Sequence, residues 1–213
     1  MVVTLISLIA AIFAIVLHEI AHGFAAWRLG DDTAKFYGRL SLNPLKHLDL
    51  YGSVVIPGLL LFSNLPALGW AKPVPVNFAN LRNQTWALVV VAAAGIITNL
   101  ILAFVSAVLL MLFSPFLPQI LSLFLLKFAY INIILAMFNL LPIPPLDGSK
   151  IFFGWVHRPW AKKYLSLERH MLLPIFAIVI ILPWLSNQFG FDLLGSYFGF
   201  GIEAFFKFVH LFF

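Results

Sequence analysis

The chain has 213 residues, of which 62% are hydrophobic and only 10% are charged, and its mean hydropathy is +1.03. This balance is far from that of soluble globular proteins and indicates an integral membrane protein. The net charge is +5, but the basic residues are not interleaved with aromatic residues on a polar face, which argues against nucleic-acid binding. Cysteine is absent, so the sequence excludes disulfides, thiolate metal sites and cysteine nucleophiles.

The apolar residues from Val2 to Trp27 are predicted to form the first membrane span. A cleavable signal peptide would have Lys or Arg before its apolar run and an Ala-x-Ala-like site after it. Neither is present, so we expect this span to be retained. Three ionisable residues, His18, Glu19 and His22, lie at its inner end. Each costs about 2.5 to 3.5 kcal/mol on insertion scales, which calls for a compensating partner such as a bound cation.

His18 and His22 are four residues apart and therefore share one helix face, the arrangement in which two imidazoles bind one zinc ion. Glu19 can reach the position that such an ion leaves open and take a proton from water there. The alternative is a pair of hydrogen-bonded histidines on an inward helix face. The cost of an uncompensated Glu19 in a bilayer disfavours this alternative.

The next apolar segment, Gly52 to Leu68, is short and contains two prolines. Six Lys and Arg lie from Arg28 to Arg82 and five from Lys150 to Arg169, and a full crossing would divide them between the two sides, against the positive-inside rule. We therefore predict a re-entrant segment that keeps all of them on the cytoplasmic side. Irregular backbone at membrane depth is tolerated only beside protein or a water-filled cavity, so this segment is expected to line a site.

Two short β-strands, Lys35 to Asn43 and Lys72 to Asn77, are predicted near that site. A substrate in extended conformation could add to their edge by main-chain pairing. Pro73 and Pro75 would leave gaps in one edge, as expected for a strand that is exposed on one side.

The residues Trp86 to Phe113, and Lys127 to Leu141 with the apolar residues before it, are predicted to form two further spans. We single out one amide in each, Asn99 and Asn139, because an unpaired polar group in an apolar span is costly. Either amide could stabilise the oxyanion of a tetrahedral intermediate, or could instead hold helices together by hydrogen bonds.

Asp147 follows the third span, within the segment Asn139 to Gly148. Three prolines end the helix and Gly148 relaxes the backbone, so the carboxylate can turn back to the depth of His18 and His22. It would then be the third protein ligand that a catalytic zinc site requires. The alternative is a loop aspartate that starts a turn at the membrane surface.

The C-terminal part is predicted to contain a span at Met171 to Leu185. Leu193 to Phe213 is apolar but carries Glu203 and Lys207 at helical spacing, so it forms either a last span or an interfacial helix. His47 is expected to be solvated or interfacial. We expect one domain over residues 1–213, with a core at 2–150 and C-terminal membrane segments at 171–213.

Four motifs occur along the chain in the order His18–His22, Gly69–Asn77, Ala94–Asn99 and Asn139–Gly148. Together they resemble the site-2 protease family of intramembrane zinc metalloproteases, in its small prokaryotic branch without PDZ or CBS domains. The likeness covers about Val2 to Lys150 and fades beyond. It implies that His18, His22 and Asp147 bind zinc, that Glu19 is the general base, and that Asn99 and Asn139 lie near the site. Leu146 departs from the Phe of many members, which we expect to affect packing only.

The predicted fold is an all-α polytopic membrane protein of about four to six membrane segments, with a re-entrant loop and short β-strands near the active site. The resemblance implies hydrolysis of peptide bonds in or near transmembrane segments of membrane-protein substrates, in regulated intramembrane proteolysis, with one Zn²⁺ per chain. We expect a multi-pass protein of the cell membrane with its active site toward the cytoplasm. The expected partners are the substrate and the lipid bilayer, with any regulatory partner unidentified.

The alternative function is a membrane metal-ion carrier or channel that uses the same His and Asp cluster. Transport needs ligands at several depths, whereas this sequence concentrates them at one. A carrier also has no need for a general base such as Glu19.

Overall fold

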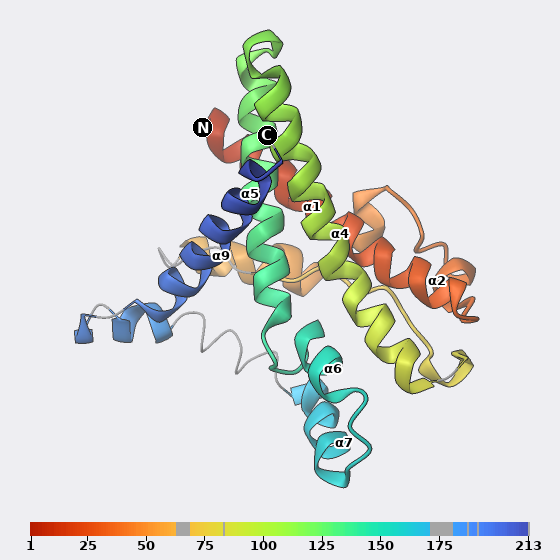
Figure 1. The fold of residues 1–213 in the computed structure, drawn as a ribbon. Helices are drawn as coiled ribbons and strands as arrows, with labels where there is room; N and C mark the ends of the chain where they lie inside the picture. The colour runs from red at the N-terminus through yellow and green to blue at the C-terminus, as the bar shows by residue number, and fades with distance from the viewer. Residues whose placement is uncertain (63–68, 83, 171–180, 187, 191, 213) are drawn as a thin grey trace.

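The computed structural model describes residues 1–62, 69–82, 84–170, 181–186, 188–190 and 192–212. Three helices in these residues are long and apolar enough to cross a membrane: α1 (Val2–Arg28), α4 (Gln84–Phe113) and α5 (Gln119–Leu140). They coincide with the three spans predicted up to residue 141. Figure 1 shows α4 and α5 side by side, with α1 crossing behind them and in contact with both.

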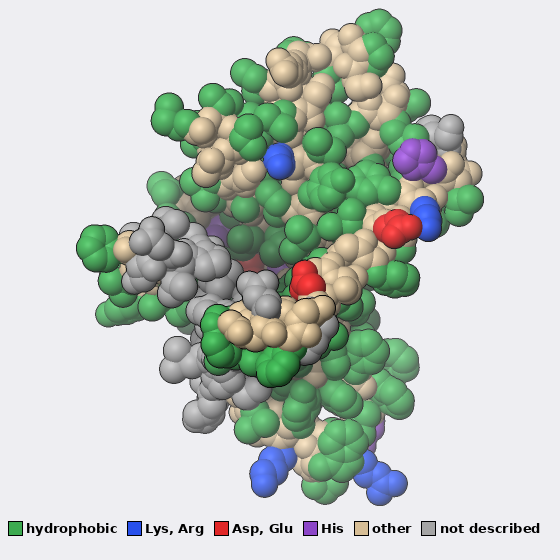
Figure 2. Space-filling model, turned by 90° about the vertical axis from the view of Figure 1, so that its left-hand side faces the viewer, with side chains coloured by type: hydrophobic (Ala, Val, Ile, Leu, Met, Phe, Trp, Pro, Cys, Tyr) green, Lys and Arg blue, Asp and Glu red, His purple; other side chains and the backbone are tan. Residues whose placement is uncertain are grey.

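Small residues allow these helices to pack closely. Ala10 and Ala14 of α1 are fully buried against Phe128 of α5, and small side chains at such contacts let two membrane helices approach. The opposite faces expose many large apolar side chains, and Figure 2 shows hydrophobic groups over most of one side of the molecule. Such a surface is suited to lipid and not to water.

The site lies at the end of the bundle where α1 ends, α4 begins and α5 ends. The Arg82 N–H, just before α4, donates to the Leu29 carbonyl, just after α1, over 3.0 Å. After α5 the chain turns into two short helices, α6 (Asp147–Phe153) and α7 (Pro159–Leu165), and α6 packs on α4 and α5. Asp147 therefore returns to the part of the bundle that holds His18 and His22.

The connection between α1 and α4 consists of short elements, and its outgoing and returning halves lie close together. The Lys72 N–H donates to the His47 carbonyl over 2.9 Å, and the Trp70 N–H donates to the Gly52 carbonyl over 3.0 Å. The two ends of the segment predicted to be re-entrant therefore lie close together, and residues 63–68 of that segment lie outside the described chain. The elements are α2 (Thr33–Phe36), η1 (Pro44–His47), the π-helical η2 (Leu50–Val55), α3 (Ile56–Phe62) and η3 (Phe78–Asn80).

The predicted short strands are not observed, since the described residues contain no β-strand. Lys35–Asn43 begins inside helix α2 and continues through a turn at Gly38, whose φ of 61° suits glycine. Lys72–Asn77 lacks helix and turn but pairs with no neighbouring strand. Two of its residues are prolines without an N–H, and most of its other amides are bonded elsewhere, as described below.

The remaining elements are η4 (Ser114–Phe116), η5 (Ser166–His170) and α9 (Leu193–His210). Most of the span predicted at Met171–Leu185 lies outside the described residues. Helix α9 packs along α5, and the Tyr197 hydroxyl donates to the Met137 carbonyl over 3.0 Å. The three helices that are long and apolar enough to cross a membrane do not include it.

Candidate metal centre

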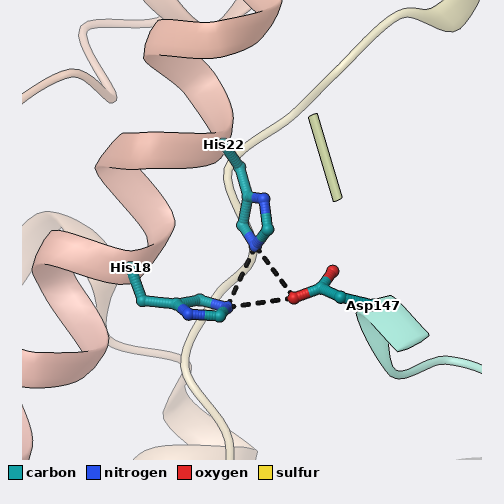
Figure 3. A group of neighbouring side chains, drawn as sticks. All are labelled: His18, His22 and Asp147. Atoms are coloured by element: carbon teal, nitrogen blue, oxygen red, sulfur yellow. Dashed lines mark hydrogen bonds and ion pairs between the residues drawn. The ribbon is translucent and has the colours of Figure 1, made fainter. Parts of the chain in front are cut away.

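Three side chains from two helices converge on one point (Figure 3). His18 and His22 come from α1 and Asp147 is the first residue of α6. The two Nε2 atoms are 3.0 Å apart, and each lies 3.2 Å from Oδ2 of Asp147. The side chains are 8%, 12% and 11% exposed, so the convergence is shielded from solvent.

This geometry fits a tetrahedral zinc ion. Two ligand atoms at about 2.0 Å from such an ion are separated by about 3.3 Å, close to the three distances observed. Asp147 Oδ2 is buried and faces the Nε2 atoms of His18 and His22, and three ligand atoms that meet in a buried site with their lone pairs toward one another are costly unless a cation lies between them. A cation bound by the three atoms would remove this cost.

Asp147 reaches the histidines because the chain folds tightly after α5. A Cβ atom at Gly148 would overlap the carbonyl oxygens of Leu140 and Leu141, so only glycine allows α6 to begin this close to the end of α5. The Tyr164 hydroxyl on α7 donates to the Pro142 carbonyl over 2.6 Å and ties down the proline-containing turn. These contacts explain how a residue after a membrane span points back into the bundle.

Helix α4 supports the opposite edges of both imidazoles. Nδ1 of His22 lies 2.7 Å from the Val91 carbonyl, and Nδ1 of His18 lies 3.2 Å from Nδ2 of Asn99. Gly95 lies between these two residues on the same helix face. A ring nitrogen that does not bind metal is normally held in this way by an outer partner, which orients the ring.

We expect Gly95→Ala to weaken zinc binding by about 10-fold or more, on the scale of losing an outer partner. A Cβ at this position would lie 2.5 Å from Cε1 of His18 and 2.6 Å from Nε2 of His22, so at least one ring must move. Competition with a chelator on the purified protein measures the affinity. Gly199→Ala is the matched control, because a Cβ there meets nothing within 4 Å; equal zinc affinity in all three proteins would contradict the expected clash.

Glu19 is held by the extended segment that follows the re-entrant loop. The Val74 N–H donates to Glu19 Oε2 over 2.7 Å. Pro73 and Pro75 on either side have no N–H, so Val74 provides the only amide at this point. The contact fixes one carboxylate oxygen of Glu19 and leaves the other for a proton.

Asp31 and Arg39 fasten this extended segment at its two ends. The Arg39 guanidinium donates to the Lys72 carbonyl over 2.7 Å. Asp31 is fully buried and accepts four hydrogen bonds, from the Thr33 N–H, the Thr33 hydroxyl, the Asn77 N–H and the Asn80 side chain. Burial raises the pKa of the Asp31 carboxyl, but these hydrogen bonds outweigh it and hold the pKa below its usual value.

We expect Asp31→Asn to lower the free energy of unfolding at neutral pH by about 2 kcal/mol, because an amide cannot accept all four bonds. A depressed pKa in the folded state contributes stability above the ordinary value of 3.8, and this is lost as the pH falls through the folded pKa. The difference between the two proteins should therefore shrink as the pH is lowered below about 4. Measuring the free energy of unfolding in detergent at several pH values tests this expectation. Asp32→Asn, which changes the exposed neighbour, is the control. A difference between the native and Asp31→Asn proteins that does not depend on pH would contradict it.

The other predicted site residues have mixed positions. Asn99 is fully buried beside His18, whereas the Asn139 amide donates to Leu135 one turn earlier in α5, and the role of either in catalysis stays a prediction.

His47, expected to be solvated, is instead 2% exposed and bonds to the Ser41 carbonyl. Sequence reasoning also passed over Asn132, a fully buried amide of α5.

Comparison with known sequences shows which proteins this chain is similar to. A sequence model described as Peptidase family M50 matches residues 114–184. Three relatives carry the name "Putative zinc metalloprotease". YwhC of Bacillus subtilis is 37% identical over 186 residues, which cover 82% of this chain and 80% of the relative. Rip2 of Mycolicibacterium smegmatis is 29% identical over 91% of this chain and 73% of its own. MJ0611 of Methanocaldococcus jannaschii is 31% identical over 82% of each chain.

No solved structure matches the chain. The family match includes Asp147 and continues to residue 184, so the expectation that the likeness fades beyond Lys150 was wrong. Identity to YwhC extends over four fifths of both sequences. The chain therefore belongs to Peptidase family M50, the site-2 protease family, and is a metalloprotease.

Proposed function

We propose that this protein hydrolyses peptide bonds in or near transmembrane segments of membrane-protein substrates, with one zinc ion per chain. The observation that carries the proposal is the convergence of His18, His22 and Asp147, with Glu19 next to His18 in the sequence. These residues lie on or next to helices that are apolar enough to cross a bilayer. A site at that depth is suited to a substrate that is itself in the membrane.

The chemistry divides between the metal and Glu19. Bound zinc would polarise the scissile carbonyl group and make water at its open position more acidic. Glu19 accepts the proton of the attacking water and passes it to the leaving amine. The Val74 N–H holds Glu19 Oε2, so Oε1 is the oxygen that handles the proton.

A helical substrate must unwind before it reacts, because its peptide groups are hydrogen-bonded within the helix. The extended segment Lys72–Asn77 can receive it, but its main chain is largely occupied. The amides of Lys72, Val74 and Asn77 already donate within the protein, and Pro73 and Pro75 have none. Val76 is the one residue of this segment whose N–H has no partner within the described chain, so we propose that the substrate pairs at Val76.

The purified protein, incubated with a panel of membrane-anchored peptides and analysed by mass spectrometry, tests the proposal. We expect zinc-dependent cleavage within or near the membrane segment of some peptides. Cleavage of water-soluble peptides alone would contradict an intramembrane substrate. Zinc flux across vesicles without hydrolysis of any peptide would instead favour the metal carrier.

The proposed topology places the active site toward the cytoplasm of a multi-pass protein in the cell membrane. The hydrogen bonds between the Gly52 and Trp70 ends of the re-entrant path, and between Leu29 and Arg82, support a return to the side where α1 ends. Under the positive-inside rule, the basic residues gathered at that side face the cytoplasm.

Single cysteines at four positions test this topology without background, because the native chain has no cysteine. Lys35, Ala79 and Lys162 are expected inside and Ser114 outside, and all four are exposed. An impermeant thiol reagent added to intact cells should therefore label only the cysteine at Ser114. Permeabilised cells provide the control, in which all four should react. Labelling at Ala79 or Lys162 in intact cells would contradict the arrangement.

A further inference from the structure

The contact between Asn99 and His18 requires a protonation of the His18 ring that does not suit zinc binding. Asn99 is 0% exposed, its Nδ2 lies 3.2 Å from Nδ1 of His18, and its Oδ1 has no hydrogen-bond partner among the described residues. An amide nitrogen can only donate. The contact therefore requires that Nδ1 of His18 accept a hydrogen bond.

The metal site requires the opposite. Nε2 of His18 faces Nε2 of His22 and Oδ2 of Asp147, so Nε2 must offer its lone pair to the metal. A neutral imidazole that binds metal through Nε2 carries its proton on Nδ1. Nδ1 of His18 is then a donor and needs an acceptor.

Asn99 supplies that acceptor when its carboxamide makes a half-turn. The oxygen and the nitrogen of a carboxamide have almost the same shape, so the half-turn exchanges them without moving any other atom. Oδ1 then lies at the position facing Nδ1 of His18, and a contact between two donors becomes a hydrogen bond. Nδ2 then takes the position that Oδ1 held before the half-turn.

The imidazole of His22 is also held at Nδ1 by an acceptor on α4. Nδ1 of His22 lies 2.7 Å from the Val91 carbonyl, which can only accept, so this ring presents Nε2 to the metal. Val91 and Asn99 are eight residues apart on α4 and therefore lie on one face of it, with Gly95 between them. One face of α4 thus fixes the orientation of both histidines.

We infer that Asn99 is a positioning residue for zinc, whose Oδ1 accepts the Nδ1–H of His18 and keeps Nε2 directed at the metal. The inference rests on the proposed zinc site. It differs from the oxyanion donor considered from the sequence, because Asn99 contacts the edge of the ring away from Nε2. A donor to the oxyanion would have to lie about 2.7 to 3.1 Å from the reacting oxygen.

Two substitutions separate an acceptor from a donor. Asn99→Asp keeps an acceptor oxygen in almost the same shape but has no N–H, whereas Asn99→Leu removes both. We expect zinc affinity, measured by chelator competition, to fall about 10-fold to 100-fold in Asn99→Leu and to stay within about threefold of the native protein in Asn99→Asp, since a carboxylate is a common partner of a metal-binding histidine. Asn132→Leu, which removes a different fully buried amide, should leave zinc affinity unchanged.

Turnover of a cleaved peptide provides the second readout. Asn99→Asp should keep most of the native rate, whereas loss of an oxyanion donor would lower kcat by about 10²-fold to 10³-fold with zinc still bound. Zinc affinity in Asn99→Leu equal to that of the native protein would overturn the inference, and so would an Asn99→Asp protein that holds zinc but does not turn over. If Asn99→Leu does not fold, Asn99→Asp alone decides between the roles. Absence of zinc binding by the native protein would overturn the proposed function itself.

Discussion

Glu19→Gln is expected to lower the rate of peptide hydrolysis by about 10³-fold, within the range that a general base contributes. Glutamine has nearly the same shape as glutamate, and its oxygen can still accept the Val74 N–H that now bonds Glu19 Oε2. It cannot take a proton from water. The side chain and the extended segment should therefore stay in place while the proton transfer is lost.

Zinc content distinguishes this result from damage to the site. Glu19 is not one of the three residues whose ligand atoms converge, so Glu19→Gln should bind as much zinc as the native protein. The matched control is Asp49→Asn, which changes another carboxylate that accepts a backbone N–H, that of Gly52, and should retain activity. Turnover near the native rate in Glu19→Gln would remove Glu19 from the role of general base.

The spacing of residues in the first span predicted that the side chains of His18 and His22 would converge, as the structure shows. His18 and His22 four residues apart can only share a face if the segment is helical, and the apolar run makes the helix certain enough to place them. The three prolines before Asp147 also predicted the end of the third helix, because proline interrupts a helix. These parts of the site depend on local rules.

The contacts that hold Glu19 and the two rings could not be predicted in the same way. The Val74 backbone N–H bonds to Glu19, which is 55 positions away in the sequence. Almost every residue type has a backbone N–H, so the identity of residue 74 does not reveal this bond. Asn99 and Asn132 are both amides in apolar spans and both fully buried, yet only Asn99 meets a histidine. Which amide does so depends on how α1, α4 and α5 are rotated against one another.

The predicted β-strands failed for a related reason. Extended residues form a strand only if a partner offers free main-chain groups, and the pairing depends on tertiary structure. Around Lys72–Asn77 the partners are the His47 carbonyl, which accepts from the Lys72 N–H, and three side chains, which are the Arg39 guanidinium and the carboxylates of Glu19 and Asp31. Side chains thus satisfy the groups that a neighbouring strand would otherwise use.

Asp147→Ala is expected to reduce zinc affinity by more than about 100-fold, because losing a ligand should weaken binding more than losing a residue, such as Asn99, that only orients a ligand. Asp147 supplies the only carboxylate oxygen in the converging group, and without it two imidazoles remain, one fewer than the three protein ligands of a catalytic zinc site. Hydrolysis should be lost together with the metal, unlike in Glu19→Gln, where the metal stays.

Asp147 also begins helix α6, where a negative charge is favourable, so the alanine variant could lose zinc because α6 is displaced. Asp147→Asn separates the two effects, because the amide keeps the side-chain shape while losing the charge that a zinc ligand provides. We expect Asp147→Asn to bind zinc weakly while its helix content and unfolding temperature stay near those of the native protein. Undiminished zinc in Asp147→Ala would remove Asp147 from the ligand set.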